Sequence, residues 1–583
     1  MKLAALLVVF LQVSQPAIQP SRAAEKASIE GVVLRAGSGD PLPRAEVRLT
    51  RVLSEENQGK VIFDGATEAQ GLPSMLTESD GKFLLKDLEP GQYRLMAFRN
   101  GYAEQAYGRK GSSGPGTIIN LSAGEKLANV VFRLVPAGVI TGRVRDASGE
   151  PVARFDVTLL KASYNGERQF LSEEDSTRTD DRGEYRFFWI PSGRYYVRVS
   201  RPRQSGSVSR RIVADSTTPA AYYPGVLDAS SALVIDLTAG AEISGIDLVL
   251  PRASGNRIRG RVVDASTGKP PTSASVSVLP KKERMFENAF EEADETQYNS
   301  MTGEFEIRNV LPGSYWLAAI AQPKFDAPLS PEQLAEVRTG ADIFTSMFLG
   351  GASAQTSIDM NGVDREDIVL TLTKGTTVPV LLGVEGAEWA SLKEADDIRV
   401  SLAPEISRFQ YRQGSRPSTE GIARIENVSA GQYRVMVEYP PSANLYVKDI
   451  LYGRSNALAT PIEITDQPPS AIVVLLSPRG GQVEGRLTDA LSQPVSGVDV
   501  ALIPDERERS PLFKTAVTDR EGRFTFGAVA PGGYKVFSWE ALEEGEYHNK
   551  QVLSKYESQG RSVRVQESSK ERVDLKIIPA PQQ

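Results

Sequence analysis

Two glycines ten positions apart recur five times along this 583-residue chain, each pair followed two residues later by a tyrosine. We call this set the glycine–tyrosine frame. Its members are Gly81, Gly91 and Tyr93; Gly183, Gly193 and Tyr195; Gly303, Gly313 and Tyr315; Gly421, Gly431 and Tyr433; and Gly522, Gly532 and Tyr534. Self-similarity at a fixed phase constrains the architecture before any single residue is interpreted. The chain is therefore expected to repeat one structural unit five times.

The spacing of the frames predicts separate domains. Their first glycines fall at positions 81, 183, 303, 421 and 522. This period is domain-sized and exceeds the roughly 20–50 residues of a solenoid repeat. After an N-terminal segment, 1–23, we predict modules at 28–136, 137–252, 256–373, 375–478 and 480–579, the third with an insertion at 322–360.

The fifth module shows the strand pattern most clearly. Apolar and polar residues alternate along Val498–Leu502, and a turn cluster at Asp519–Gly522 precedes Phe524 and Phe526. Alternation with period two marks strands with one buried face, and short strands between regular turns are typical of a sandwich. The predicted fold class is all-β, a tandem array of about five antiparallel β-sandwich modules.

Most modules open with a strand led by glycine, as in Gly31, Gly142, Gly260 and Gly485. The fourth module has Val378–Leu382 instead, so we expect the fold to survive there with an altered edge. One short helix is expected at Ser330–Val337, where a serine cap precedes a proline in the first turn.

The spans Asp181–Val197 and Asp519–Val536 carry aspartate, glycine, aromatic and Gly-x-Tyr residues in one order, and in this they resemble carboxypeptidase regulatory-like domains. The resemblance extends over about residues 28–579. It implies prealbumin-like or Ig-like sandwiches of the transthyretin-like and Cna-B-like type. In that family the module is an appendage of peptidases, receptors or surface proteins, and related sandwiches are grouped with carbohydrate-binding-like folds.

The N-terminus has the pattern of a signal peptide. Lys2 precedes the apolar run Leu3–Val13, and small residues at Ser21 and Ala23 suit cleavage after Ala23. This run is shorter than the roughly 20 residues that span a bilayer. We expect an exported mature chain without an integral membrane segment, located in the periplasm, on the outer surface or in the medium.

Composition excludes several kinds of site. The chain has no cysteine, so disulfides and thiolate sites are impossible. Lys and Arg number 67 against 74 Asp and Glu, a net charge of −7, which gives no global attraction for nucleic acid. His548 is the only histidine, which excludes zinc sites that need two, and nearby glutamates predict a solvated acidic loop around it. No catalytic, cofactor-binding or metal residues are predicted, and no enzyme.

Two sets of aromatic residues need separate interpretations. The frame tyrosines alternate with apolar neighbours and are expected in the cores, and the frame glycines are expected in turns with positive φ. A second set lies in loop-like sequence. These aromatics either form shallow platforms for sugars or peptides or pin loops onto the sandwich. The candidate ligand-binding residues of this second set are Tyr107 with Arg109, Tyr223, Phe348, and Tyr452 with Arg454.

Three further patterns have a structural and a functional interpretation. Turn carboxylates suit either a calcium loop or ordinary hairpins. A basic stretch is either an anion-docking surface or a solvated loop. Lysine–asparagine cross-links, which occur in Cna-B-like sandwiches, are not expected because the residues do not recur between modules. The carboxylates are Asp80, Asp180, Asp181 and Asp519, and the basic stretch is Arg198, Arg201, Arg203, Arg210 and Arg211.

The leading functional hypothesis is a non-enzymatic exported scaffold or interaction protein, with a polysaccharide or a cell-envelope protein as its partner. With strands of about seven residues rising ~3.3 Å each, five modules end to end reach on the order of 150 Å. The alternative is a carbohydrate-binding protein that uses the loop aromatics. A third hypothesis, an unrecognised hydrolase, lacks any identifiable site.

Overall fold

The computed structural model describes residues 25–52, 74–109, 116–165, 168–201, 219–251, 255–281, 297–321, 352–404, 413–465, 469–507, 512–540, 542 and 545–579. The predicted signal peptide, the predicted helix at 330–337 and Phe348 lie outside these residues. The described chain is almost entirely β, and its strands form ten sheets, two for each frame. This confirms the prediction of tandem β-sandwich modules. We keep the module boundaries as predicted from the sequence, but the predicted insertion at 322–360 is too long, because residues 353–360 form a strand of module three's second sheet.

Each of the first two modules has one sheet built on its opening strand and a second built on its frame-tyrosine strand. Module one pairs the sheet β4-β1-β8 with β3-β2-β5-β6, and β7 joins β5. Its strands are β1 (Ala27–Arg35), β2 (Glu46–Arg51), β3 (Ser74–Leu76), β4 (Lys82–Leu88), β5 (Gly91–Phe98), β6 (Gln105–Ala106), β7 (Ile119–Leu121) and β8 (Lys126–Leu134). Module two pairs β12-β9-β16, with β17 on β9, against β11-β10-β13-β14, with β15 on β13. Its elements are β9 (Gly138–Asp146), β10 (Asp156–Asn165), β11 (Arg168–Arg178), β12 (Glu184–Ile190), β13 (Gly193–Ser200), β14 (Ala221–Tyr222), η2 (Ala229–Ser231), β15 (Ile235–Leu237), β16 (Glu242–Ile243) and β17 (Leu248–Leu250).

Modules three and four vary the same plan. Module three has the sheets β20-β21-β18-β24 and β19-β22-β23. Its strands are β18 (Asn256–Asp264), β19 (Ala274–Pro280), β20 (Gln297–Tyr298), β21 (Glu304–Val310), β22 (Gly313–Ala321), β23 (Ser353–Met360) and β24 (Arg365–Leu372). Module four extends its first sheet to β28-β25-β33-β30-β31, opposite β27-β26-β29-β32. Its elements are β25 (Thr376–Val384), η4 (Trp389–Ser391), η5 (Ala395–Asp397), β26 (Arg399–Pro404), β27 (Gln413–Ser415), β28 (Ile422–Val428), β29 (Gly431–Glu438), η6 (Pro441–Ala443), β30 (Tyr446–Tyr452), β31 (Ser455–Asn456), β32 (Ile462–Ile464) and β33 (Ile472–Ser477).

Module five has the sheet β37-β34-β40, with β41 on β34, opposite β36-β35-β38-β39. It also carries a short helical segment after its frame-tyrosine strand. Its elements are β34 (Gly481–Thr488), β35 (Asp499–Pro504), β36 (Lys514–Val517), β37 (Arg523–Val529), β38 (Gly532–Phe537), η8 (Glu546–His548), α3 (Lys550–Ser554), β39 (Arg561–Val565), β40 (Lys570–Arg572) and β41 (Leu575–Lys576).

The opening-strand glycines mark a close approach between two backbones. In every module the opening strand pairs in parallel with a strand near the module's end. A Cβ placed on Gly31, Gly142, Gly260 or Gly485 would lie 1.9 to 2.1 Å from a carbonyl oxygen of that closing segment. The same Cβ would lie 2.7 to 2.8 Å from an aromatic side chain on the neighbouring antiparallel strand. Only glycine fits here, since any side chain would collide with backbone.

Module four replaces this arrangement with a different pair of residues. Val380 stands opposite Ala423 on β28 and opposite Ile472 on β33. In module one the corresponding positions hold Gly31 opposite Phe83. In module four the larger side chain of the pair is on the opening strand β25, whereas in module one it is on the neighbouring strand β4. The parallel pairing of β25 with β33 runs without a register shift, so Val380 is fully buried without a backbone collision. Strands β30 and β31 extend this sheet beyond β33, whereas β25 itself lies between β28 and β33 and is not the edge that the sequence predicted.

The frame tyrosines lie in the cores, as expected, with 1 to 7% of each residue exposed. The hydroxyls of Tyr93, Tyr195, Tyr433 and Tyr534 each donate to the carbonyl four residues earlier, at 2.8 to 2.9 Å. The first frame glycines have φ between +73° and +76°, which confirms their predicted role in turns. That prediction is wrong for Gly91, Gly193 and Gly532, which are not among the positive-φ residues. A Cβ on these three would instead be 3.4 to 3.5 Å from the ring of their own frame tyrosine.

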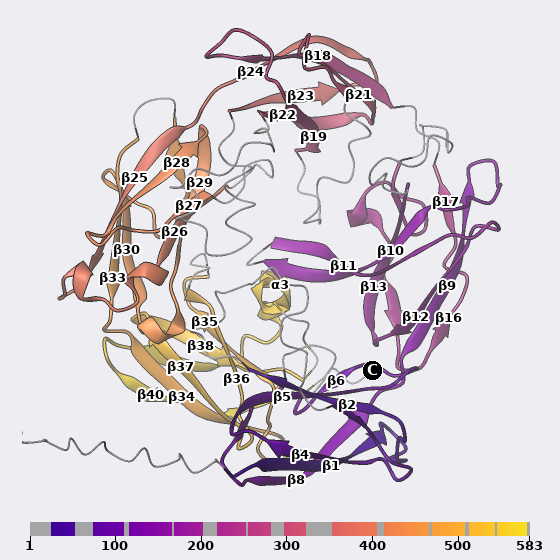
Figure 1. Ribbon diagram of the computed structural model, residues 1–583, viewed down its shortest axis with the longest axis vertical. Coiled ribbons are helices and arrows are strands. Elements are labelled where there is room, and N and C mark those ends of the chain that lie inside the picture. The colour runs from indigo at the N-terminus through magenta and orange to yellow at the C-terminus, as the bar shows by residue number, and fades with distance from the viewer. Residues whose placement is uncertain are drawn as a thin grey trace, which may run out of the picture.

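The modules are arranged in a closed ring rather than end to end (Figure 1). Module five reaches module one, where Arg520 lies 3.6 Å from Glu125 and a Cβ on Gly497 would sit 2.2 Å from the Gly108 carbonyl oxygen. The short helix α3 lies inside the ring, near the hairpin of β10 and β11 (Figure 1). Beside it, Glu546 accepts a hydrogen bond from Arg194 of module two at 3.0 Å. The expected extended array of about 150 Å is therefore wrong.

Replacing Gly485 by alanine is expected to break the pairing of the first and last strands of module five. The added methyl would lie 1.9 Å from the Val573 carbonyl oxygen, and we expect a local loss of about 3 kcal/mol. Hydrogen–deuterium exchange read by mass spectrometry should show lost protection in β34. The matched control is Gly383→Ala in β25, where the added methyl meets nothing within 4 Å. Equal protection in both variants would contradict the packing argument.

A methyl group at Gly497 is expected to open the ring. Gly497→Ala would collide with the backbone of Gly108, so small-angle scattering should show a larger maximum dimension for the mature chain. Combining it with Arg194→Ala also removes the ion pair with Glu546 and should open the ring further. Gly268→Ala is the control, because its φ of +68° matches the +69° of Gly497 and nothing lies within 4 Å. Scattering that is unchanged in the double variant would disprove the closed ring.

Candidate functional site

The first predicted ligand set lies at the contact between modules one and five. Tyr107 packs against the module-one core, and its ring meets Phe132 edge to face at 6.1 Å. Arg109 is partly buried, and desolvation lowers the pKa of its guanidinium. Gly108, between them, supplies the carbonyl that Gly497 approaches. These residues therefore support a contact between modules, and ligand binding by them stays a prediction.

The other predicted aromatics lie in different modules, each against its own core. Tyr223 follows β14 and packs on the module-two core. Tyr452 is the last residue of β30 and packs on the module-four core, so it ends a strand rather than lying in a loop. Arg454 is exposed in the turn between β30 and β31. The three sets contribute to no common platform in the described residues, and their binding role also stays a prediction.

His548 does not lie in a solvated acidic loop, and that prediction is wrong. It belongs to η8, where its ring lies 4.6 Å from the rings of both Phe513 and Tyr547. The neighbouring Glu546 is buried and pairs with Arg194. An aromatic cluster that includes Trp539 holds this segment on module five. The histidine therefore helps to attach the segment that carries the contact with module two.

The basic stretch and the turn carboxylates also have structural roles. Arg198 lies within β13 and is only 5% exposed, so it is not part of a solvated loop. Arg203, Arg210 and Arg211 lie outside the described residues. The Asp180 carboxylate accepts hydrogen bonds from the backbone amides of residues 182 and 184, and Asp519 does the same for residues 521 and 523. Across the described ranges, no three acidic or histidine side chains converge as a metal site would require.

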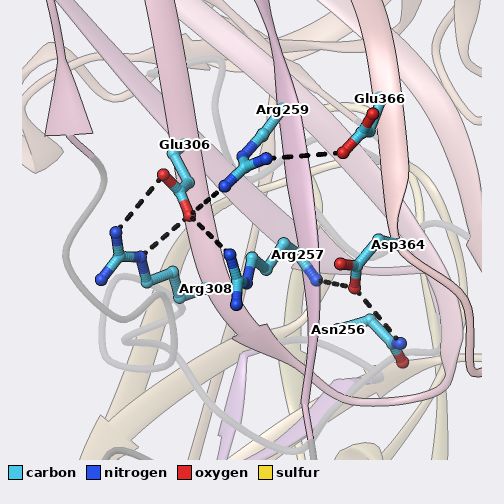
Figure 2. A network of polar contacts seen from close by, with 7 residues as sticks. All are labelled: Asn256, Arg257, Arg259, Glu306, Arg308, Asp364 and Glu366. Carbon is cyan, nitrogen blue, oxygen red and sulfur yellow. Dashed lines mark hydrogen bonds and ion pairs between the residues drawn. The ribbon is translucent and has the colours of Figure 1, made fainter.

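An extensive polar network lies on the outer sheet of module three, across β18, β21 and β24 (Figure 2). Glu306 receives Arg308 at 2.9 Å, Arg259 at 3.4 Å and Arg257 at 3.9 Å. The contacts with Arg308 and Arg259 lower the pKa of its carboxyl. Asp364 accepts from the backbone amide of Arg257 at 2.8 Å. Arg259 also reaches Glu366 at 3.5 Å.

The three arginines of this network face three carboxylates, so their charges are already balanced. The arginines are about half exposed, with 44 to 53% of each side chain accessible. Exposed pairs of this kind contribute little stability each. The network is therefore a ladder of charge pairs across neighbouring strands, and it leaves no arginine of the three free for an anionic ligand.

A second network joins modules four and five. Glu385 of module four binds Arg479 and Lys448, and accepts from the Ser477 hydroxyl at 2.7 Å. These hydrogen bonds hold the pKa of Glu385 at about 2. Glu567 of module five lies 3.2 Å from Lys448 and 3.4 Å from Arg479. Two cations thus bridge carboxylates on both sides of the junction.

Sequence reasoning missed the residues that connect modules, because they do not recur with the frame. On the module-five side, these contacts are made by residues outside the glycine–tyrosine frame: Gly497, Arg520, Glu546 and Glu567. The length of the chain gave no signal, because the stretch from Tyr534 to β39 is shorter than the matching stretches of modules two and three. None of the helices in the described chain is both long and apolar enough to cross a bilayer.

Comparisons with known proteins agree with the sandwich architecture. Residues 139–222 match the model of the family described as carboxypeptidase regulatory-like domain. No curated protein matches the chain. The fold assignment rests on the sheets described above, and not on alignments with solved structures.

Several solved structures are similar to parts of the chain. The minor pilin GBS52 of Streptococcus agalactiae is 13% identical, with 40% of this chain and 97% of that chain covered and a TM-score of 0.21. A streptococcal ancillary pilin is 11% identical, with coverage of 60% and 99% and a TM-score of 0.20. The shaft pilin SpaA of Lactobacillus rhamnosus GG is 12% identical, with coverage of 40% and 98% and a TM-score of 0.17. The sheets make the chain a tandem array of β-sandwich modules, and residues 139–222 match the carboxypeptidase regulatory-like domain family.

Proposed function

We propose that this protein is an exported, non-enzymatic scaffold that holds five sandwich modules in a fixed ring and presents their outer surfaces to a partner in the cell envelope. The observation that carries this proposal is the set of contacts that module five makes with modules one, two and four. Domains joined only by linkers move relative to one another by default. Contacts between modules far apart in sequence fix their outer surfaces relative to one another.

The ring supports a scaffold because a preorganised surface loses less entropy on binding. The contacts consist of ion pairs and close backbone approaches, which depend on geometry rather than on apolar area. Regulatory-like modules are also generally non-catalytic in the family that residues 139–222 match. Export rests on the predicted signal peptide at residues 1–23.

The test is binding of the purified mature chain to envelope proteins from its source organism, measured with and without protease treatment of that fraction. We expect saturable, protease-sensitive binding without turnover of envelope substrates. Gly497→Ala should bind about tenfold more weakly because preorganisation is lost, whereas Gly268→Ala should bind normally. Turnover that disappears in His548→Ala would overturn the non-enzymatic proposal. Equal binding by both glycine variants would show that binding does not depend on the ring.

A second candidate function, carbohydrate binding, is favoured by a surface pair of aromatics in module two. Phe188 and Trp189 are 52% and 48% exposed, and their rings meet at 5.1 Å and 88°. Trp189 has a φ of +60°, a conformation that is unusual for a bulky residue. Asp87 and Asn427 have the corresponding position and φ in modules one and four, and such residues tolerate it better. Module two therefore combines a strained backbone with a half-exposed indole, which a stacked sugar ring would explain.

Trp189→Asn tests this second candidate without disturbing the fold. The substitution installs the residue type that module four has at this position, so stability should be kept or increased. If the pair stacks on sugars, glycan-array binding by the mature chain should fall at least about tenfold. The control is Asn427→Asp, which exchanges residues that both tolerate this φ. Glycan binding that survives Trp189→Asn would show that the glycan binds elsewhere on the chain. Absence of glycan binding by the wild type would rule out carbohydrate binding as a function.

A further inference from the structure

A cavity of about 90 Å³ lies where module four meets module five. Module four contributes Val435, Val447 and Ile450 to its wall, and module five contributes Leu512, Ala530 and Lys514. Ligand cavities form preferentially at domain interfaces and combine apolar walls with a few polar groups. This cavity has that composition, since its one cationic side chain lies among aliphatic and tyrosine neighbours.

The position of Lys514 is unusual for a charged residue. It begins β36, an edge strand, directly opposite the fully buried Leu502. Ala516, two residues further along the strand, packs against the module-five core, and so does Leu512, which lies just before the strand. Because side chains alternate along a strand, Lys514 shares their inward face. The aliphatic stem of Lys514 therefore runs beside apolar side chains into the junction.

Lys514 also differs from the other cations around it. Lys535 and Arg507 of module five share Glu557, at 2.7 and 3.1 Å. Lys448, on the far side of the junction, pairs with Glu567 at 3.2 Å. No carboxylate within ion-pair distance of Lys514 is found in the described chain. Desolvation without such a partner lowers the pKa of its ammonium group. A charge in apolar surroundings is costly unless it is paired.

We propose that the cavity between modules four and five binds a small organic monocarboxylate with an aliphatic tail, whose carboxylate pairs with the Lys514 ammonium. The ligand supplies the counter-charge that the described residues do not, and its tail contacts Val435, Val447 and Ile450. A cavity of about 150 Å³ accepts benzene. The volume here is smaller, so the cavity encloses only a short apolar tail. This proposal does not depend on the scaffold function.

The competing explanation is structural. An inward-pointing charge on an edge strand prevents that edge from pairing with another chain. In that case Lys514 would need no ligand, and the cavity would be a packing defect of the junction. The two explanations differ in what happens when a carboxylate is added and when the charge is removed.

Isothermal titration of the mature chain with three probes of equal length separates them: hexanoate, hexanamide and hexylammonium. We expect saturable binding of one hexanoate per chain, hexanamide at least about tenfold weaker, and no binding of hexylammonium. Hexanoate should also raise the melting temperature of the junction, because it binds only the folded state. Similar affinity for all three probes would overturn the proposal.

Variants of the residues that line the cavity test whether hexanoate binds there. Lys514→Met keeps the length of the side chain and removes a poorly solvated charge, so it should fold and lose at least about tenfold in hexanoate affinity. Ala530→Leu should abolish binding by filling the cavity while leaving Lys514 in place. Lys570→Met is the control, an exposed lysine of the same module with the same change of charge. No hexanoate binding by the wild type, together with self-association of Lys514→Met, would establish edge protection instead.

Discussion

The parallel pairing of the first and last strands of each module is the constraint on which the rest of the structure depends. In module one it places Arg35 beside Leu134, so the chain leaves the module at the end opposite its entry. An antiparallel closing strand would return the chain to its starting end. The same pairing recurs in the other four modules, and it passes the chain from module to module in one direction. The opening-strand glycines exist because this pairing brings a carbonyl oxygen to within contact of the backbone.

Module four shows that the repeat follows a packing rule rather than a fixed sequence. Where the other modules place a glycine against an aromatic ring, it places Val380 against Ala423. Both pairs fill one layer between neighbouring strands, and cores tolerate such exchanges when total volume is kept. The frame tyrosine is kept because it serves two needs at once. Tyr433 fills the core with its ring and binds a backbone carbonyl with its hydroxyl.

The ring arises from residues that the repeat does not contain. Neighbouring modules touch through local contacts such as the hydrogen bond between the Ser353 and Ser429 hydroxyls. Closure depends on module five, whose helical segment is held by a stack of Phe537, Trp539 and Tyr547 and carries Glu546 to module two. The same module forms one side of the cavity beside Lys514. Its non-repeated residues thus decide both the overall shape and the proposed ligand site.

The sequence by itself determined the repetition of one module, its all-β character, the burial of the frame tyrosines and the divergent opening strand of module four. These follow from local periodicity and turn chemistry, which each short segment carries in its own residues. Only the tertiary structure decided the ring, the aromatic environment of His548, the burial of Arg198 and the position of Lys514 away from any described carboxylate. Each of these depends on which residues from distant modules or strands come into contact. Local sequence patterns do not specify such contacts. The acidic residues around His548 suggested a solvent-exposed loop, yet Glu546 pairs with Arg194, which lies 352 positions earlier in the chain.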